Sequence, residues 1–119
     1  MKISILPRNG LLLVRIEETD ALVQHNAQHL KDAVLKELIA GGPHVLIDCG
    51  ALKGIDSAGA GALITILKAV HRRGGRMGLV RVAPQVRTTL SVVRLTSVLE
   101  IFANETEAAA ALASSTALS

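Results

Sequence analysis

The spacing of hydrophobic positions changes several times along the chain, and each change marks a different kind of element. Two short apolar runs, at 3–6 and 11–16, flank the segment Pro7-Arg8-Asn9-Gly10. An Asn-Gly pair between two such runs is a turn signal, so this pattern predicts a β-hairpin.

A helical spacing follows the hairpin. Apolar residues recur at intervals of three and four from Asn26 to Leu38, which predicts a helix. The segment Gly41-Gly42-Pro43 is expected to end that helix. Val45-Leu46-Ile47 is apolar at every position, as is typical of a strand covered on both faces.

The second half of the chain repeats this alternation. A helix is predicted after Asp56-Ser57, ending at Gly74-Gly75. Its expected buried stripe consists of Ala62, Leu63, Ile66, Leu67 and Val70, with Lys68 and Arg72 outward. We then expect a strand at 77–82, a helix from Pro84 with Val86, Leu90 and Val93 inward, a strand at 98–102, a helix at 105–112 capped by Asn104, and a frayed tail at 113–119.

Strands that alternate with helices predict βα units and a mostly parallel sheet, which the hairpin makes mixed. The expected fold class is therefore α/β, with about four helices. The 119 residues fit a single domain over 1–119, and no repeat or linker divides them. Half of the residues are hydrophobic, enough to bury a core without disulfides or metal.

Charge and composition exclude several classes of function. Thirteen basic and ten acidic residues give a formal charge of +3, without the dense cationic stripe of a dedicated nucleic-acid binder. The single cysteine excludes an internal disulfide and fits a reducing compartment. No apolar run approaches the roughly 20 residues that span a bilayer, and the first residues lack a signal-peptide pattern. We expect a cytoplasmic protein without membrane insertion.

The pair Asp56-Ser57 is the strongest candidate for a functional site. It stands at a predicted helix start, where unpaired backbone N–H groups and the helix dipole favour negative charge. Ser57 can cap the helix with its hydroxyl or carry a phosphate there. Asp56 can steer that hydroxyl or complement the dipole. The small residues Gly59, Ala60 and Gly61 allow either close approach by a partner or tight packing of the helix on the sheet.

The histidines and the cysteine give weaker indications of a functional site. His25 and His29 are four apart, but no third ligand accompanies them, so a metal site is not expected. His44 and His71 are expected to be isolated surface residues. Cys49 is interpreted as a small residue at a strand end rather than a nucleophile. Without a phosphate-binding glycine loop or paired carboxylates, the sequence predicts neither an enzyme nor a cofactor.

Cations gather where the second helix is expected to end. They are Lys68, His71, Arg72, Arg73 and Arg76. Positive charge there complements the negative end of the helix dipole, which suffices to explain the cluster. The same charge can steer an acidic partner towards the protein.

Taken together, these motifs resemble the STAS domain family, the sulfate transporter and anti-sigma factor antagonist domains. The likeness covers nearly the full length: the hairpin entry, the strand followed by Ile55-Asp56-Ser57-Ala58-Gly59-Ala60-Gly61, the Gly74-Gly75 segment before a strand, and Val86-Arg87-Thr88-Thr89-Leu90 leading to 98–102. The size is similar to that of free-standing anti-sigma factor antagonists.

The resemblance implies a regulated binding protein. An anti-sigma factor that is itself a serine kinase would phosphorylate Ser57, and a serine phosphatase would restore the hydroxyl. The unphosphorylated form would bind the anti-sigma factor and so regulate transcription. The residues implied in partner binding are Asp56, Ser57, Ala58, Gly59, Ala60 and Gly61.

The chain departs from the family pattern at two positions. Val23 stands where an aspartate is expected, with Asp20 nearby, and Ala58 replaces a small hydroxyl residue. Two other roles remain open: a STAS subunit of a membrane lipid-transport ATPase complex, and a scaffold in a stress-signalling assembly. The sequence leaves the oligomeric state open.

Overall fold

The strands form one mixed five-stranded sheet and a small second sheet. The computed structural model describes residues 1–8, 10–38 and 44–118, with side chains up to residue 112. The main sheet has the order β1-β2-β4-β6-β7, made of β1 (Lys2–Arg8), β2 (Leu11–Glu17), β4 (His44–Asp48), β6 (Met77–Val80) and β7 (Glu100–Phe102). The second sheet pairs β3 (Ala21–Leu22) with β5 (Gly54–Ile55) in parallel.

Strand direction confirms the predicted fold class. β1 and β2 form the antiparallel hairpin, in register from Arg8 opposite Leu11 to Lys2 opposite Glu17. The pairs β2–β4, β4–β6 and β6–β7 are all parallel. All five residues of β4 are buried, and the apolar run at 45–47 predicted this for the three central ones. Asn9, in the predicted turn, lies outside the described residues.

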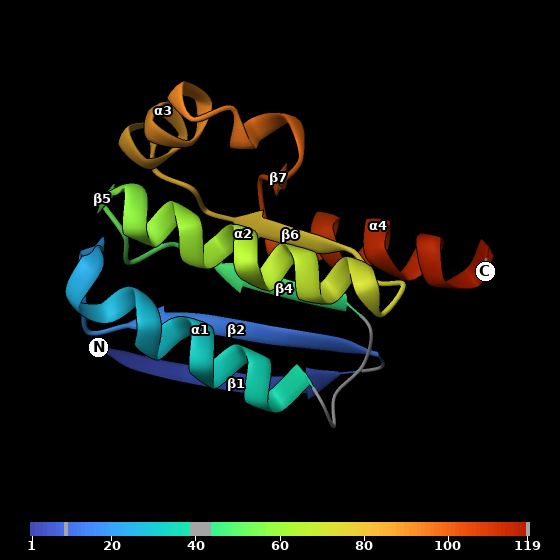
Figure 1. The fold of residues 1–119 in the computed structure, drawn as a ribbon. Coiled ribbons are helices and arrows are strands. Elements are labelled where there is room, and N and C mark those ends of the chain that lie inside the picture. Colours follow the sequence, from blue (N-terminus) through green and yellow to red (C-terminus); the bar gives the residue numbers. More distant parts are fainter. Residues whose placement is uncertain (9, 39–43, 119) are drawn as a thin grey trace.

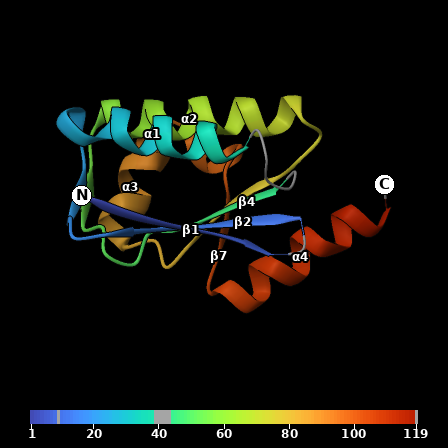
Figure 2. The same ribbon diagram turned by 90° about the horizontal axis from the view of Figure 1, so that it is seen from below.

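Helices cover both faces of the main sheet. They are α1 (Gln24–Leu38), α2 (Ser57–Arg72), α3 (Pro84–Val92), the 3-10 turn η1 (Leu95–Ser97) and α4 (Glu105–Leu118). α1 and α2 lie side by side on one face and α4 lies on the other (Figures 1 and 2). The predicted helix stop at Gly41-Gly42-Pro43 lies outside the described residues. Of the helices in the described part of the chain, none combines the length and apolar character that a membrane crossing requires.

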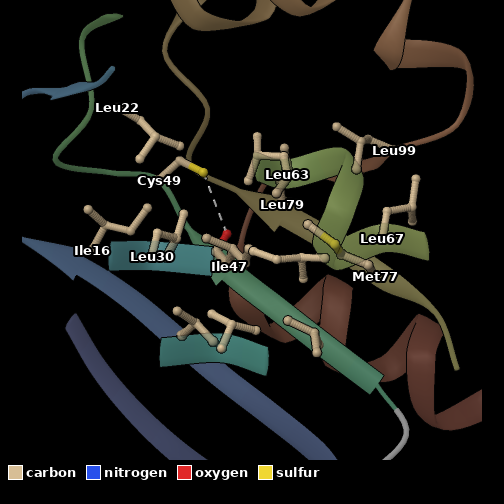
Figure 3. Close-up of a cluster of buried hydrophobic side chains, with 14 of the residues drawn as sticks. Ile16, Leu22, Leu30, Ile47, Cys49, Leu63, Leu67, Met77, Leu79 and Leu99 are labelled. Atoms are coloured by element: carbon tan, nitrogen blue, oxygen red, sulfur yellow. Dashed lines mark hydrogen bonds between the residues drawn. The ribbon is translucent and has the colours of Figure 1, made fainter. Parts of the chain in front are cut away.

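Two hydrophobic clusters of different size hold these layers together. The larger one fills the space between the sheet and the pair α1–α2, and Figure 3 shows part of it. The stripe predicted for α2, from Ala62 to Val70, is buried as expected. The smaller cluster lies under α4 and joins Leu13, Leu46 and Val80 to Ala108 and Leu112.

Three element boundaries differ from the sequence expectation. α3 ends at Val92, so Val93 leaves the helical spacing and is 43% exposed instead of pointing inward. β6 ends at Val80 because Arg81 has a left-handed backbone with φ of 55°. β7 begins at Glu100 rather than at position 98 because a 3-10 turn precedes it.

The start of the first helix and the end of the last helix also differ from the sequence expectation. α1 begins at Gln24, two residues before Asn26. α4 continues to Leu118, so the expected helix end at Leu112 is wrong, while the fraying expected from residue 113 stays a prediction. An alanine-rich sequence favours this continuation, because alanine has the highest helix propensity.

Candidate functional site

Asp56, and not Ser57, caps the start of α2. The Asp56 backbone is extended, with φ of −109° and ψ of −175°, and its Oδ1 accepts a hydrogen bond from the Gly59 backbone N–H at 2.9 Å. Ser57 is already the first residue of the helix. The N-cap role expected for Ser57 therefore belongs to its neighbour, which leaves the Ser57 hydroxyl unused for capping.

The same carboxylate also holds the start of α1. Its Oδ2 accepts from the Gln24 backbone N–H at 3.1 Å, and the Asp56 backbone N–H donates to the Leu22 carbonyl at 3.2 Å. The amide of Gly59, followed by that of Gln24, lowers the pKa of Asp56 below its ordinary value. Two helix N-termini thus converge on one anionic side chain.

The start of α1 is held without an acidic side chain at Val23, the residue before its first turn. Asn26 accepts from the Val23 backbone N–H at 2.9 Å through Oδ1 and donates to the Ala21 carbonyl at 2.9 Å through Nδ2. Asn26 and Asp56 together accept hydrogen bonds from the backbone N–H groups of Val23 and Gln24 at the start of α1. Asp20 is exposed, and its carbonyl accepts from Lys53 and Gly54.

Ser57 is open to solvent. Its residue is exposed, and within the described residues no hydrogen bond involves its hydroxyl. A group attached to Oγ would lie beside the positive ends of two helices, and also beside the negative Asp56 carboxylate. The geometry thus presents an accessible nucleophilic oxygen in a field that a helix pair makes favourable for a phosphate.

The small residues after Ser57 divide into two groups. Gly59 and Ala60 are buried, and a Cβ on Gly59 would lie 2.2 Å from the Leu22 carbonyl oxygen. They therefore serve the packing of α2, and the expectation that they contact a partner stays a prediction. Ala58 is half-buried and Gly61 is exposed, with open space where a Cβ would stand.

An open groove of about 400 Å³ runs between α1 and α2 next to this site. Its walls combine small residues with long polar side chains. They are Gln24, Ala27, Gln28, Lys31, Ala58, Gly61, Ala62 and Thr65. The sequence pattern gave no sign of it, because the two walls come from helices about 30 positions apart in the chain.

A second carboxylate, which the sequence analysis did not single out, lies at the end of β4. Asp48 is 3% exposed and accepts from Arg81 Nη2 at 2.7 Å, Arg81 Nε at 3.0 Å and Arg15 Nε at 3.3 Å. Burial opposes its charged form, but the hydrogen bonds of Arg81, Gly50 and Arg15 hold the pKa of Asp48 below its ordinary value. All the polar atoms of this carboxylate are engaged, so it is a structural ion cluster.

The remaining candidates fall into different environments. His44 is buried, contrary to expectation, and its Nδ1 accepts from the Arg76 backbone N–H at 3.0 Å. Cys49 is buried as expected and donates to the Ile47 carbonyl at 3.8 Å (Figure 3). Burial raises the pKa of the Cys49 thiol to about 12. His25 and His29 are exposed on α1; among the described residues no three His, Cys, Asp or Glu side chains are grouped to hold a metal ion.

The cationic cluster at the end of α2 is not uniform. Lys68, His71, Arg72 and Arg73 are exposed, as expected for charges that complement the helix end. Arg76 instead forms an ion pair with Glu100 and donates to the Ala111 carbonyl at 3.0 Å. It therefore connects β6 to β7 and α4.

The fold is shared with anti-sigma factor antagonists of known structure. A STAS domain protein from Planctomyces limnophilus superposes with a TM-score of 0.86 at 19% identity, covering 93% of this chain and 97% of that chain. For an anti-sigma factor antagonist from Mycobacterium paratuberculosis the values are 0.82, 18%, 94% and 93%. For the antagonist SpoIIAA in its unphosphorylated form they are 0.80, 17%, 95% and 97%.

At these identities the structural likeness concerns the fold. The sequence itself carries the further step, because the family model described as "STAS domain" matches residues 2–108. That match includes the hairpin, the start of α2 with Asp56 and Ser57, and the first residues of α4. The chain therefore belongs to the STAS domain family.

Proposed function

We propose that this protein is an anti-sigma factor antagonist whose binding to an anti-sigma factor is switched off by phosphorylation of Ser57. The observation that carries the proposal is the exposed Ser57 hydroxyl at the start of α2, which makes no hydrogen bond to the part of the chain that the structure describes. The anti-sigma factor is itself the serine kinase: it transfers the γ-phosphoryl group of ATP to Oγ, with release of ADP and the hydroxyl proton. A serine phosphatase hydrolyses the ester.

Local electrostatics make this site suitable for a switch. Phosphorylation adds about −1.5 to −2 charges and three acceptor oxygens at neutral pH. The N-termini of α1 and α2 favour that charge, so the domain keeps its fold. A partner shaped to the bare serine instead meets a bulky, hydrated anion next to the Asp56 carboxylate. Every penalty of about 1.4 kcal/mol weakens binding tenfold, so a few kcal/mol suffice.

The docking surface that we propose is narrower than the sequence suggested. Asp56, Ser57, Ala58 and Gly61 are accessible or half-buried, and the last two border the groove between α1 and α2. Small residues in the groove allow a partner's side chains to approach the helix backbones, while Gln28 and Lys31 offer polar contacts at its rim. A modified Ser57 lies at the mouth of this surface, where it can block docking.

The structural relatives support a phosphorylation switch. SpoIIAA is known in an unphosphorylated and in a phosphorylated form, and the latter matches this chain with a TM-score of 0.68 at 16% identity. The relatives thus include an antagonist that carries phosphate on this fold. Ser57 is the residue through which we extend that chemistry to this protein.

The test combines labelling with binding. The purified chain is incubated with ATP and each serine-kinase anti-sigma factor of its organism, and the product is analysed by phosphosite mass spectrometry. We expect one phosphate, on Ser57, and none on Ser57→Ala. Ser57→Asp should lose at least tenfold in affinity for the same anti-sigma factor while its circular dichroism stays that of a folded domain.

Ser91 supplies the matched control, because it is an exposed serine on α3. Ser91→Ala should be phosphorylated and Ser91→Asp should bind as the unmodified protein does. Equal binding by Ser57→Asp and Ser57→Ala would contradict the switch. Co-purification with a transport ATPase, independent of Ser57, would instead support the lipid-transport role.

A further inference from the structure

The outer edge of β1 carries unused backbone hydrogen-bonding groups. β1 is the first strand in the sheet order, and in the described part of the chain it pairs on one side only, with β2. An edge strand of seven residues offers a row of N–H and C=O groups to another strand.

The register identifies which residues of β1 face outward. The Gly10 carbonyl accepts from His44 at the start of β4, so even-numbered positions of β2 point towards β4 and odd-numbered ones towards β1. Each odd position of β2 faces an even position of β1, for example Arg15 opposite Ser4. Ile3, Ile5 and Pro7 therefore direct their backbone groups away from β2. Proline has no N–H, which agrees with this outward position.

A groove lies alongside the same edge. It has a volume of about 540 Å³ and is lined by Ile3 and Ile5 from β1 and by His29, Asp32, Ala33, Lys36 and Glu37 from α1. Both isoleucines are partly buried against the core. A strand added to β1 would place alternate side chains in this groove.

We propose that the occupant of this edge is β1 of a second copy of the chain, in an antiparallel, two-fold symmetric pair. Centred on Ser4, the pairing sets Ile3 opposite Ile5 of the second copy and joins their N–H and C=O groups in four hydrogen bonds. Each copy supplies the alternating apolar side chains that the groove of the other receives. The proposal is independent of the switch at Ser57, because none of the residues 56–61 lies in this surface.

Charge complementarity favours a second copy over an unrelated strand. α1 runs in the same direction as β1 (Figure 1), so a two-fold axis that reverses β1 also reverses α1. The groove residues of α1 carry both signs of charge, with Asp32 and Glu37 beside Lys36, so two reversed copies can set acidic side chains opposite basic ones. The register centred on Ser4 also sets Lys2 opposite Leu6, which avoids the repulsion between Lys2 and Arg8 that a register centred on Ile5 would create.

Residues that discourage strand addition lie at the two ends of β1 and do not block the register centred on Ser4. Pro7 and the charges of Lys2 and Arg8 stand near the two ends of β1, where they limit open-ended strand addition. The segment from Ile3 to Ile5 contains neither proline nor charge. The edge is therefore open for a short pairing that closes on itself.

Amide hydrogen exchange of the full chain tests the pairing without a substitution. We expect the mass in sedimentation equilibrium to rise with concentration from 12.5 kDa towards twice that value. The amides of Ile3 and Ile5 should gain protection over the same concentration range. Those of Ser4 and Leu6, which face β2, should be protected throughout and serve as internal controls.

Ile5→Pro removes the outward donor and blocks strand addition. It should weaken the dimer at least tenfold, which corresponds to about 1.4 kcal/mol. Ile5→Ala loses similar packing but keeps the N–H, so it should still dimerise. If Ile5→Pro is unfolded by circular dichroism, the exchange pattern of the unmodified chain decides.

Three outcomes would overturn the proposal. The first is a chain that stays monomeric at millimolar concentration. The second is a dimer in which Ile3 and Ile5 exchange equally fast at all concentrations. The third is a monomer in which these two amides become protected only when another protein is added, which would assign the edge to a foreign strand.

Discussion

The start of α2 and the end of β4 each hold a charged carboxylate, but different groups surround it at the two places. Each contains a carboxylate with a lowered pKa, Asp56 and Asp48, and each has a glycine at which a Cβ would collide with its surroundings. At Asp48 two arginines enclose the charge and leave it 3% exposed. At Asp56 backbone amides donate the hydrogen bonds to the carboxylate, which stays at the surface.

The difference between the two carboxylates explains why a residue beside Asp56 can be accessible for modification. Side-chain cations around Asp48 fill the space next to the carboxylate and use both of its oxygens. Backbone amides need no side-chain volume, so capping by Asp56 leaves the neighbouring Ser57 exposed. A helix start held by its own backbone can therefore be rigid and still present a hydroxyl to a partner.

The largest effect is expected from the two glycines. Gly59→Ala places a methyl group 2.2 Å from the Leu22 carbonyl oxygen, a backbone atom that cannot move alone, and should destabilise the fold by about 3 kcal/mol. In Gly50→Ala the methyl meets the Arg81 guanidinium at 2.7 Å, and this exposed group can shift, but the shift weakens its hydrogen bonds to Asp48, so the variant should lose about 1 kcal/mol. Urea unfolding of both variants measures the difference, and equal losses would refute this distinction.

A smaller loss is expected at the ion cluster. Asp48→Asn removes the charge that Arg15 and Arg81 share, and should cost about 2 kcal/mol because hydrogen bonds to a charged group are lost from a buried site. Glu17→Gln is the control, since Glu17 pairs with the exposed Lys2 at 3.8 Å and should change stability by less than about 0.5 kcal/mol. A loss at Asp48 no greater than that of the control would show that the cluster is not stabilising.

The smallest effect is expected from Asp56→Asn, because an amide oxygen still accepts a hydrogen bond from Gly59. The pKa of Asp56 is lower in the folded chain than in the unfolded chain, where it is about 3.9. The charged carboxylate therefore stabilises the fold at pH values above about 3.9, and this stabilisation is lost as the pH falls through the lower pKa of the folded chain. The Tm of the variant should lie slightly below that of the unmodified protein at pH 7, and the two should converge below about pH 4. A constant difference from pH 7 to pH 3 in thermal melts would contradict this cause.

Much of the architecture follows from local patterns. The hairpin, the apolar centre of β4 at 45–47 and the stripe of α2 from Ala62 to Val70 each show a hydrophobic pattern that the sequence reveals. The α/β class follows from their alternation. The end of α3 was missed because Val93 continues the apolar spacing one residue past the point where the helix stops.

The candidate site could be located from the sequence but not assembled from it. The sequence placed Asp56 and Ser57 at a helix start, and both residues could have been the cap. In the structure the Asp56 carboxylate also accepts from Gln24, which is 32 positions away and follows β3, the strand paired with β5. Those strands have two residues each, too few to show a period.

The sequence by itself determined the order of elements, the aliphatic core and the position of the serine, because these depend on hydrophobic spacing and on the preferences of neighbouring residues. The tertiary structure alone decided which residues meet across it: Gly59 against the Leu22 carbonyl, Asp48 between two arginines, and His44 beneath the backbone of Arg76. Contacts between distant segments are set by how layers pack, and single-residue patterns carry no record of that geometry.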